Sequence, residues 1–489
     1  MEEGGGRCSC VVEMALGEAA ATFDLEKAVC SHGLFMMPPN HWDPSTKTLQ
    51  RPLHLHSHAS SSSTTITATS LLVRISHPQN QSHSLRLLVF GTHSLSPQHR
   101  QALLGQVGRM LRLSDTDERS VREFHSICAE AKDRGFSGRL FRSPTLFEDM
   151  VKCILLCNCQ WPRTLNMARA LCELQLELQC HSSSLSGAEA VAADSNSAEA
   201  ENEHFTPKTP AGKDPKRKLG VHDVSTSLRT KFAEAKAESE ADANLRMDCV
   251  ETTNSLQTQK LSPNFLSSKI EDDLYENCNS RQTSNEIYKV DLCSPFDIQF
   301  SEGREPYFHN KIGNFPTPRE LASLDENFLA KRCNLGYRAS RILKLAQSVV
   351  EGRIQLTQLE EVGKIASLAS YDKLAEQLKE IDGFGPFTCA NVLMCMGFYH
   401  VIPTDSETIR HLKQVHARKS TIQTVQGDVE KIYGKYAPFQ FLAYWSELWH
   451  FYEKRFGKLS EIPHSDYKLM TASNMRTNGR GKNKRTKVS

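Results

Sequence analysis

The chain has 489 residues, with 59 lysine and arginine side chains against 57 aspartate and glutamate side chains, and a formal net charge of +2. This balance excludes a strongly basic or acidic protein, so any contact with nucleic acid must depend on local charge. Hydrophobic residues make up 39% of the chain, somewhat below the globular average, which indicates folded parts separated by at least one unstructured segment.

The sequence favours a reducing compartment. Its 15 cysteines show no paired spacing, and the first residues, Met-Glu-Glu-Gly-Gly-Gly, include no basic region leading into an apolar stretch. The early acids also disfavour an organellar transit peptide. No run approaches the ~18 consecutive apolar residues of a membrane span. We therefore expect a protein of the cytosol or nucleus with no membrane partner.

Short alternating segments predict an antiparallel sheet in the first part of the chain. Segments of this kind begin at Leu49, Leu71 and Leu85, and Pro, Ser, Asn and Gly residues separate them. We expect residues 1–20 to be disordered and residues 21–110 to form the sheet domain. The fold class is therefore α+β, because the rest of the folded chain has helical periodicity.

Three histidines on a predicted strand and three cysteines on a predicted helix could each suggest a metal site. They are His54, His56 and His58, and Cys153, Cys157 and Cys159. The histidines lack acidic or cysteine neighbours, and polar residues at every second position are typical of a solvated strand face. Cysteines on an apolar helix usually belong to the core. We therefore predict no metal site.

Helical spacing of apolar residues begins after about Pro97. One apolar stripe starts at Leu103 and another at Phe147, and residues 141–178 are expected to form two helices broken near Trp161-Pro162. Residues 111–178 would then be the first part of an all-helical domain.

Residues 179–309 differ sharply in composition from what precedes them. They are rich in Ser, Glu, Asp, Asn, Lys and Thr and poor in aromatic residues, which predicts a long disordered insertion. Residues 208–218 are basic, and either a nuclear-localisation signal or a solvated charge cluster would explain them. Helical periodicity resumes over residues 310–466. Residues 467–489 are expected to be a basic disordered tail suited to phosphate contacts or nuclear import, so we expect a nuclear protein.

The segment from 374 to 397 predicts two helices joined by a very short turn. Asp-Gly-Phe-Gly, containing Gly383 and Gly385, separates their apolar stripes, and a turn this tight predicts positive φ angles at the glycines. Pro386 suits the first turn of the second helix. Free amides and the helix dipole at that N-terminus form an anion site for which a DNA phosphate is a natural ligand, although such turns also occur for packing alone.

The start of the next helix contains a notable acid. Thr404 and Glu407 have the spacing of a capping box, which predicts Thr404 as N-cap and Asp405 as the first helical residue. An acid there can simply complement the helix dipole. It can equally serve as a catalytic anion, because the dipole keeps the carboxylate ionised at neutral pH. Both interpretations can hold together.

These motifs resemble the signature of the helix-hairpin-helix, Gly/Pro-Asp (HhH-GPD) superfamily of base-excision DNA glycosylases. The resemblance is carried by residues 383–390 (GFGPFTCA) followed by residues 402–405 (IPTD). Residues 335–342 (LGYRASRI) and 147–172 resemble neighbouring segments of the 8-oxoguanine and 3-methyladenine II members. In total the resemblance covers about two thirds of the chain, and it implies a sheet domain followed by a helical glycosylase domain interrupted by the insertion.

The resemblance implies roles for individual residues. It assigns DNA contacts to the hairpin residues Gly383, Phe384, Gly385, Phe387 and Thr388. It makes Asp405 the catalytic residue, acting on a nucleotide flipped out of the duplex. A carboxylate near C1' would stabilise the oxocarbenium-like sugar formed as the bond to the base breaks.

Two departures from the family pattern narrow the expected chemistry. Members that also cut the strand have a lysine two residues after the second hairpin glycine, where this chain has Phe387. Phenylalanine cannot form a Schiff base, so we expect no abasic-site lyase activity. Some members hold an iron–sulfur cluster with four cysteines after the hairpin. No cysteine follows Cys395 in this chain, and we expect no cofactor.

Further candidates follow from the resemblance and from spacing. In the resembled enzymes the loop after the opening helix fills the gap left by the flipped base, which points to Asn158 and Gln160, with Cys159 and Trp161 beside them. Trp445 and Trp449 lie four residues apart on one helix face. Core packing and a base-stacking pocket are both open for them.

Three hypotheses remain. The favoured one is a monofunctional DNA N-glycosylase that acts as a monomer on double-stranded DNA containing a base lesion and passes its product to abasic-site repair enzymes. The alternatives are a catalytically inactive helix-hairpin-helix DNA-binding protein and a repair scaffold acting through the insertion. The sequence does not specify the base, but the missing lysine favours an alkylated or deaminated one.

Overall fold

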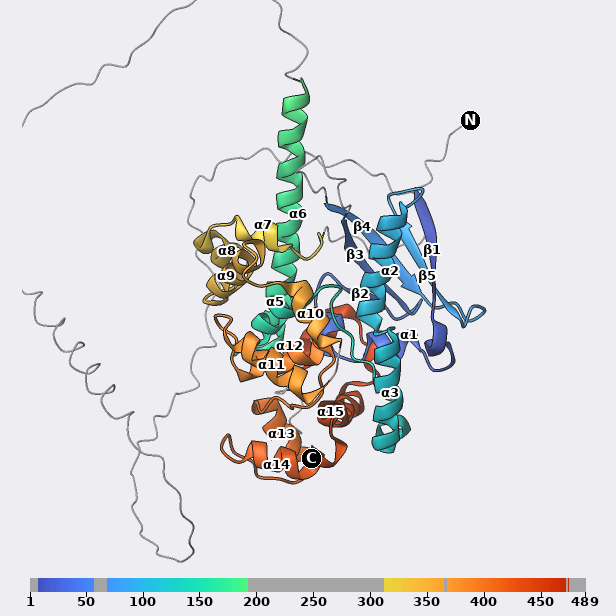
Figure 1. Cartoon of the computed structure of the whole chain (residues 1–489), viewed down its shortest axis with the longest axis vertical. Helices are drawn as coiled ribbons and strands as arrows, with labels where there is room; N and C mark the ends of the chain where they lie inside the picture. Colours follow the sequence, from blue (N-terminus) through green and yellow to red (C-terminus); the bar gives the residue numbers. More distant parts are fainter. Residues whose placement is uncertain (1–7, 57–67, 192–311, 365–366, 472–473, 475–489) are drawn as a thin grey trace, which may run out of the picture. The chain divides into compact units, whose positions relative to one another are not determined.

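The computed structural model describes residues 8–56, 68–191, 312–364, 367–471 and 474 (Figure 1). An antiparallel sheet at the N-terminal end is followed by helices, which confirms the predicted α+β class. The predicted disorder and localisation signal within residues 192–311, His58, and the basic residues after 474 lie outside the described residues.

Five strands form one antiparallel sheet in the order β1-β5-β4-β3-β2. They are β1 (Ser9–Ala15), β2 (His41–Asp43), β3 (Thr48–His56), β4 (Ala68–Ser76) and β5 (Ser84–Phe90). The three predicted strands are present as β3, β4 and β5. Alternate residues such as Leu53, Val73 and Leu87 are fully buried on one face, because successive side chains of a strand point to opposite sides of the sheet.

The expectation that residues 1–20 are disordered is wrong for the described residues of this range, which begin at residue 8. Strand β1 pairs along its whole length with β5, with Val12 opposite Leu87. It escaped prediction because it is an edge strand in which only Val12 is buried, so its apolar alternation is weak.

The helices fall into two groups along the chain. The first comprises α1 (Leu25–Val29), α2 (Pro97–Leu111), α3 (Asp115–Ile127), α4 (Ala129–Asp133), α5 (Leu146–Leu156) and α6 (Trp161–Val191). The second comprises α7 (Pro318–Ala322), α8 (Glu326–Arg332), α9 (Arg338–Val350), α10 (Leu356–Gly363), α11 (Leu368–Lys379), α12 (Pro386–Met396), α13 (Ser406–Val415), α14 (Val425–Tyr433) and α15 (Gln440–Phe456). Within the described residues, no helix is long and apolar enough to cross a membrane.

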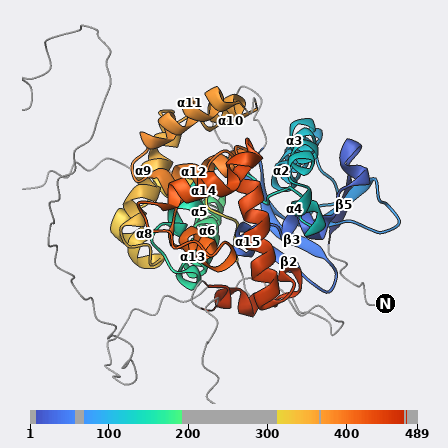
Figure 2. The ribbon, with the colours of Figure 1, turned by 90° about the horizontal axis from the view of Figure 1, so that it is seen from below.

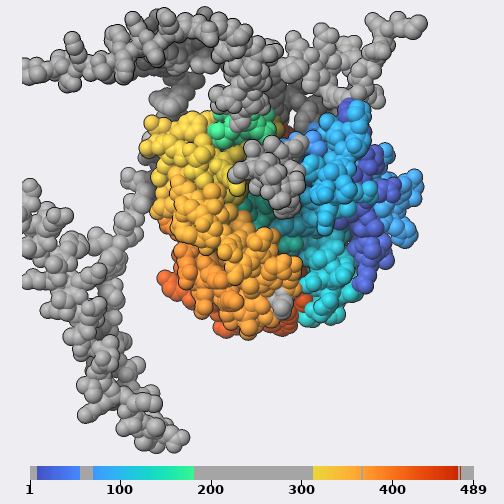
Figure 3. All heavy atoms as spheres, turned by 45° about the horizontal axis from the view of Figure 1, so that its top comes forward, coloured from blue at the N-terminus to red at the C-terminus, as the bar shows by residue number. Residues whose placement is uncertain are grey.

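A buried charge network joins the sheet to the helices. Arg51 on β3 forms a bidentate hydrogen-bonded pair with Glu148 on α5, at 3.1 and 2.9 Å. Lys152, one turn along α5, contacts the same carboxylate at 2.7 Å. All three side chains are buried, so removing one partner would leave an uncompensated charge. Figure 3 shows the surface of the N-terminal part of the chain, in blue and cyan, beside the surface of helices α7–α12, in yellow and orange.

The chain returns to α6 after the long segment that follows this helix. The amide of Gly313 donates to the carbonyl of Cys172 at 3.1 Å, and that of Asn314 donates to the side chain of Gln175 at 2.8 Å. Helix α6 itself runs on to Val191, so the predicted insertion boundary at residue 179 is too early.

The C-terminal boundary also differs from the prediction, which began a disordered tail at residue 467. Tyr467 and Met470 are buried. The Tyr467 ring packs edge-on against Phe35, with centroids 5.6 Å apart, and its carbonyl accepts a hydrogen bond from Trp161 Nε1 at 2.9 Å. The prediction missed these two buried residues because the sequence becomes basic shortly after them.

Candidate functional site

The predicted hairpin is formed by α11 and α12, with Gly383 and Gly385 between them. Gly383 has a φ of +85°, which side chains rarely adopt, and a Cβ there would lie 2.3 Å from Cδ of Arg341. Gly385 does not have the predicted positive φ. It is the extended N-cap of α12, with a φ of −86°, and a Cβ there would meet no described atom within 4 Å. The turn therefore requires glycine at 383 only, whereas Gly385 leaves open space in front of the helix.

Two arginines, the buried Arg112 and the half-buried Arg142, hold α12 at its other end. Arg112 Nη2 donates to the carbonyls of Met394 and Cys395 at 2.9 and 3.1 Å, and Arg142 Nη1 donates to Cys395 at 2.8 Å. The last carbonyls of a helix accept no hydrogen bond from the helix's own amides, and they form the negative end of its dipole. The two guanidinium groups thus fix the direction in which the N-terminus of α12 points.

The other hairpin candidates divide into buried side chains and surface groups. Phe384 is 5% exposed, so it anchors the turn in the core. Thr388 is also buried, and its hydroxyl lies 3.0 Å from Cys157 Sγ. The main-chain amides of Gly385, Phe387 and Thr388 lack helical acceptors at the start of α12, so they can serve an external anion. The Phe387 side chain is half-buried and lines a pocket.

Asp405 is itself the N-cap of α13, not its first residue as predicted, and Thr404 is exposed. Its Oδ1 accepts a hydrogen bond from the amide of Thr408 at 2.9 Å and lies 3.0 Å from the Thr408 hydroxyl. Glu407 does not complete a capping box. It accepts hydrogen bonds from Arg410 and from the Tyr452 hydroxyl. An aspartate is as good an N-cap as threonine, which is why spacing alone misplaced the boundary.

Burial raises the pKa of Asp405 above its ordinary 3.8, against the lowering effect of the two Thr408 hydrogen bonds. The direction is opposite to that expected from the helix dipole alone. No other described residue donates a hydrogen bond to Oδ2. This oxygen is therefore available to an incoming ligand, and the desolvated carboxylate would gain more from a nearby positive charge than one in water.

Asp405 lines a pocket of about 650 Å³, within the range of small-molecule binding sites. The pocket walls come from six parts of the chain, namely the N-terminus of α13, one face of α15, the first two turns of α12, the α5–α6 turn, the segment 32–36 and the C-terminal residues Lys468, Met470, Thr471 and Asn474. Figure 2 shows α15 between the other C-terminal helices and the N-terminal part.

Trp445 and Trp449, for which core and pocket roles were open, both line this pocket. Trp445 stacks on Trp449 at 5.8 Å and on Phe441 at 5.6 Å, and its Nε1 donates to the carbonyl of Ser31 at 2.8 Å. The same face of α15 adds Tyr444 and Tyr452. The wall is therefore a fixed aromatic surface suited to the flat face of a ring.

His32 extends this wall from the N-terminal part. It is buried, and its ring centroid lies 4.4 Å from that of Trp445. Burial lowers the pKa of His32 to about 3, so its imidazole is neutral at physiological pH. The pocket thus combines neutral aromatic surface with the carboxylates of Asp405 and Glu407, and Lys468 is a cation among its lining residues.

The α5–α6 turn lies beside the pocket. Gln160 is exposed and lines the pocket, whereas Asn158 is exposed on the same turn with a φ of +45° and does not line it. Arg338 holds the turn by donating to the carbonyls of Cys157 and Asn158. The structure thus brings both gap-filling candidates to one turn.

An exposed aromatic residue next to this turn was missed. Tyr337 is 48% exposed, and its hydroxyl donates to the Cys157 carbonyl at 3.3 Å. The guanidinium groups of Arg338 and Arg341 lie over its ring at 4.6 and 4.7 Å. Since Arg341 also covers Gly383, a continuous surface runs from the turn through Tyr337 to the hairpin.

Most of the missed pocket residues carried a weak signal. Phe441, Tyr444 and Tyr452 share the helical spacing of the two tryptophans, so the face of α15 could have been read from the sequence. His32 could not, because it lies more than 370 residues from Asp405 in the chain and only folding brings it there.

No protein-family model and no curated protein sequence matches the chain. Solved structures to which the chain is similar include a 3-methyladenine DNA-glycosylase from Archaeoglobus fulgidus, with a TM-score of 0.47, 13% identity, and coverage of 90% of this chain and 98% of that chain. They also include MBOgg1 in complex with a low-affinity DNA ligand (TM-score 0.43, 14% identity, 91% and 97% coverage). A third is the apo-form of the Clostridium acetobutylicum 8-oxoguanine glycosylase/lyase (TM-score 0.41, 10% identity, 91% and 96% coverage).

Proposed function

We propose that this protein is a monofunctional DNA N-glycosylase that flips a damaged base into the aromatic pocket and hydrolyses its N-glycosidic bond. The observation that carries the proposal is the position of Asp405, a partly desolvated carboxylate with one oxygen unengaged by other described residues, in the wall of that pocket. The helix-hairpin-helix sequence motif supports the same function independently.

The DNA would bind across the surface formed by the α5–α6 turn, Tyr337, Arg341 and the hairpin. The amides at the start of α12 would hold a phosphate, since Gly385 leaves room for the DNA backbone to approach. Asn158 or Tyr337, both exposed, would occupy the space left by the flipped nucleotide. Such contacts position the duplex without reading its sequence.

In the reaction, loss of the base leaves positive charge on the sugar ring, and Asp405 would stabilise it and orient a water molecule. Phe387 lines the pocket where related lyases have an amine, so water would be the nucleophile and an intact abasic site the product.

The pocket favours an electron-poor base. Aromatic faces attract cations, and the carboxylate of Asp405, which has no ion-pair partner among the described residues, adds to this attraction. We therefore propose an alkylated, positively charged purine as the preferred lesion, ahead of oxidised guanine and uracil. The protein would act in the nucleus as a monomer, and abasic-site enzymes would process its product.

The test is base release from duplex oligonucleotides that contain an alkylated purine, 8-oxoguanine, uracil or a mismatched thymine. The wild-type protein should release at least the alkylated purine. Asp405→Asn should lower the rate by about a hundredfold or more, because it removes the charge facing the sugar but keeps the shape. Glu407→Gln, a change of the neighbouring carboxylate, is the matched control and should have a smaller effect.

Failure of the wild-type protein to release any base, with duplex binding intact, would instead support the inactive DNA-binding hypothesis. Equal rates for the wild type and Asp405→Asn would overturn the role of Asp405.

A further inference from the structure

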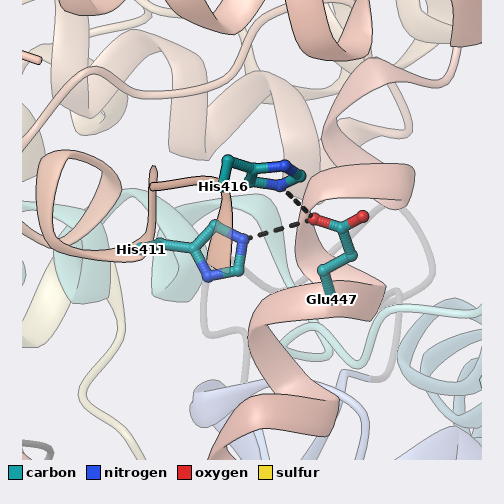
Figure 4. Close-up of side chains that lie close together, drawn as sticks. All are labelled: His411, His416 and Glu447. Atoms are coloured by element: carbon teal, nitrogen blue, oxygen red, sulfur yellow. Dashed lines mark hydrogen bonds and ion pairs between the residues drawn. The ribbon is translucent and has the colours of Figure 1, made fainter. Parts of the chain in front are cut away.

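A second cluster of chemically active side chains lies on the C-terminal helices, and the sequence had given no sign of it. His411 on α13, His416 directly after α13 and Glu447 on α15 converge, with all their ligand atoms within 4.8 Å of one another (Figure 4). Tyr433, the last residue of α14, joins them. These residues are spread over 37 positions and have no recognisable spacing, so the expectation of no metal site, which rested on the strand histidines and helix cysteines, did not consider them.

Three groups meet at a single carboxylate oxygen. Oε2 of Glu447 lies 2.6 Å from the Tyr433 hydroxyl, 2.8 Å from His416 Nε2 and 3.4 Å from His411 Nε2. The Tyr433 hydroxyl is also 3.0 and 3.2 Å from the two imidazole nitrogens. A carboxylate oxygen has about two lone-pair sites, so it cannot accept good hydrogen bonds from all three of these neighbours at once.

We propose that His411, His416 and Glu447 form a binding site for one divalent transition-metal ion, with zinc as the best match. Two imidazole nitrogens and one carboxylate oxygen are a ligand set typical of zinc, and a water molecule can take the fourth position. Around an ion with bonds of about 2.0–2.1 Å, tetrahedral ligand atoms lie about 3.3 Å apart, and the two imidazole nitrogens lie 2.8 and 3.4 Å from Oε2 of Glu447.

The surroundings suit such a site. His411 is wholly buried, and its Nδ1 has no hydrogen-bond partner among the described residues, so its polar contacts are all directed at the cluster through Nε2. Arg134 lies 3.5 Å from the other carboxylate oxygen, Oε1, and leaves Oε2 to the cluster. His416 is partly exposed, which gives an ion a route of entry.

The expected role is structural. The ion would link the end of α13 to α15, whereas Asp405 caps the opposite end of α13 and the aromatic wall lies on α15. It would thus fix the two helices that define the pocket, without touching the substrate. The site does not depend on the proposed glycosylase activity.

The experiment uses the full chain with any affinity tag removed, stripped of metal by a chelator and then titrated with Zn²⁺ alone. Bound zinc per chain is measured by elemental analysis and calorimetry. The wild type should bind one more equivalent than His416→Ala or Glu447→Gln, and the exposed His83→Ala serves as the matched histidine control that retains it. Zn²⁺ should also raise the Tm of the wild type and of His83→Ala but not that of the two site variants.

Equal zinc stoichiometry in the wild type and the site variants would overturn the proposal, since the cluster would then be an ordinary hydrogen-bond network. Glu447→Gln keeps the size of the side chain and removes only its charge. It therefore decides the question even if His416→Ala does not fold.

Discussion

Asp405 combines two roles that work against each other. As the N-cap of α13 it accepts the Thr408 amide, which stabilises the helix. As a desolvated carboxylate it is held in an environment that disfavours its charge, and its pKa is raised by burial. A desolvated anion is a poor choice for stability but a good one for stabilising a developing cation.

This conflict predicts how stability depends on pH. Because the folded-state pKa of Asp405 lies above 3.8, the folded chain binds this proton more tightly than the unfolded chain. The contribution of Asp405 to the free energy of unfolding therefore falls as the pH rises from 3.8 through the folded-state pKa, and stays low above it. Asparagine does not ionise, so the Asp405→Asn variant does not lose unfolding free energy in this way as the pH rises, and asparagine is also a good N-cap.

We accordingly expect Asp405→Asn to gain stability relative to the wild type between acidic and neutral pH. The measurement is urea unfolding of both proteins at a pH below 3.8 and at neutral pH. A difference in unfolding free energy that is independent of pH would show that burial does not raise this pKa.

Phe387 leads to a separate prediction about the reaction. A phenyl ring has no amine to attack the sugar, so incubation with lesion DNA and borohydride should trap no covalent complex, and strands should break only after alkali. Phe387→Lys should gain at most weak trapping, because a new ammonium group needs a lowered pKa before it becomes a nucleophile.

Efficient trapping by the wild type would mean that another amine has taken this role. Lys468 is the lysine among the described pocket-lining residues, so Lys468→Ala is the variant that would identify it.

The two glycines of the hairpin between α11 and α12 have different roles. Gly383 allows the turn, and Gly385 leaves space for a ligand to approach the start of α12. Gly383 is needed for a positive φ and for contact with Arg341, whereas Gly385 has an ordinary backbone and open space around it. The two substitutions should therefore separate folding from binding.

Gly383→Ala should lower the free energy of unfolding by about 1–2 kcal/mol, since a side chain is strained at this φ. Gly385→Val should leave stability nearly unchanged but weaken binding to damaged and undamaged duplexes alike, because the lost contact is to a phosphate. The measurements are chemical denaturation and duplex titration of both variants. Full duplex affinity in folded Gly385→Val would contradict the proposed phosphate site.

Across the whole protein, distant segments are joined by single, specific hydrogen bonds. Trp42 Nε1 donates to the carbonyl of Ser460 at 2.9 Å, and Trp161 Nε1 donates to that of Tyr467 at 2.9 Å. These bonds link the sheet and the α5–α6 region to the C-terminal segment. The pocket is lined both by residues of the N-terminal part and by the C-terminal segment that these bonds hold in place. Its shape therefore depends on the N-terminal part as well as on the helices.

The return of the chain to α6 predicts that much of residues 192–311 can be removed. Gly313 and Asn314 contact α6 at Cys172 and Gln175, so both flanks are already held beside each other. Replacing residues 185–305 with a short flexible linker should leave the Tm within a few degrees and the rate of base release within about twofold, because loop closure depends only weakly on length. Thermal unfolding and base release of the two proteins test this, and a deleted protein that fails to fold would contradict it.

Sequence alone determined the features that arise within a few residues of one another. The period of apolar residues predicted β3 to β5 and the break between α5 and α6, and the glycine turn predicted the hairpin. It also singled out Asp405, Phe387, Trp445 and Trp449, which line the pocket.

Tertiary structure decided whatever depends on contacts between distant segments. Edge strand β1 and the residue Tyr467 are stabilised by partners far away in the chain, so their own sequence carries little signal. The raised pKa of Asp405 is an effect of burial, which a local capping pattern cannot show. The pocket wall at His32 and the cluster around Glu447 exist only because the fold brings residues from different helices within a few ångströms of each other.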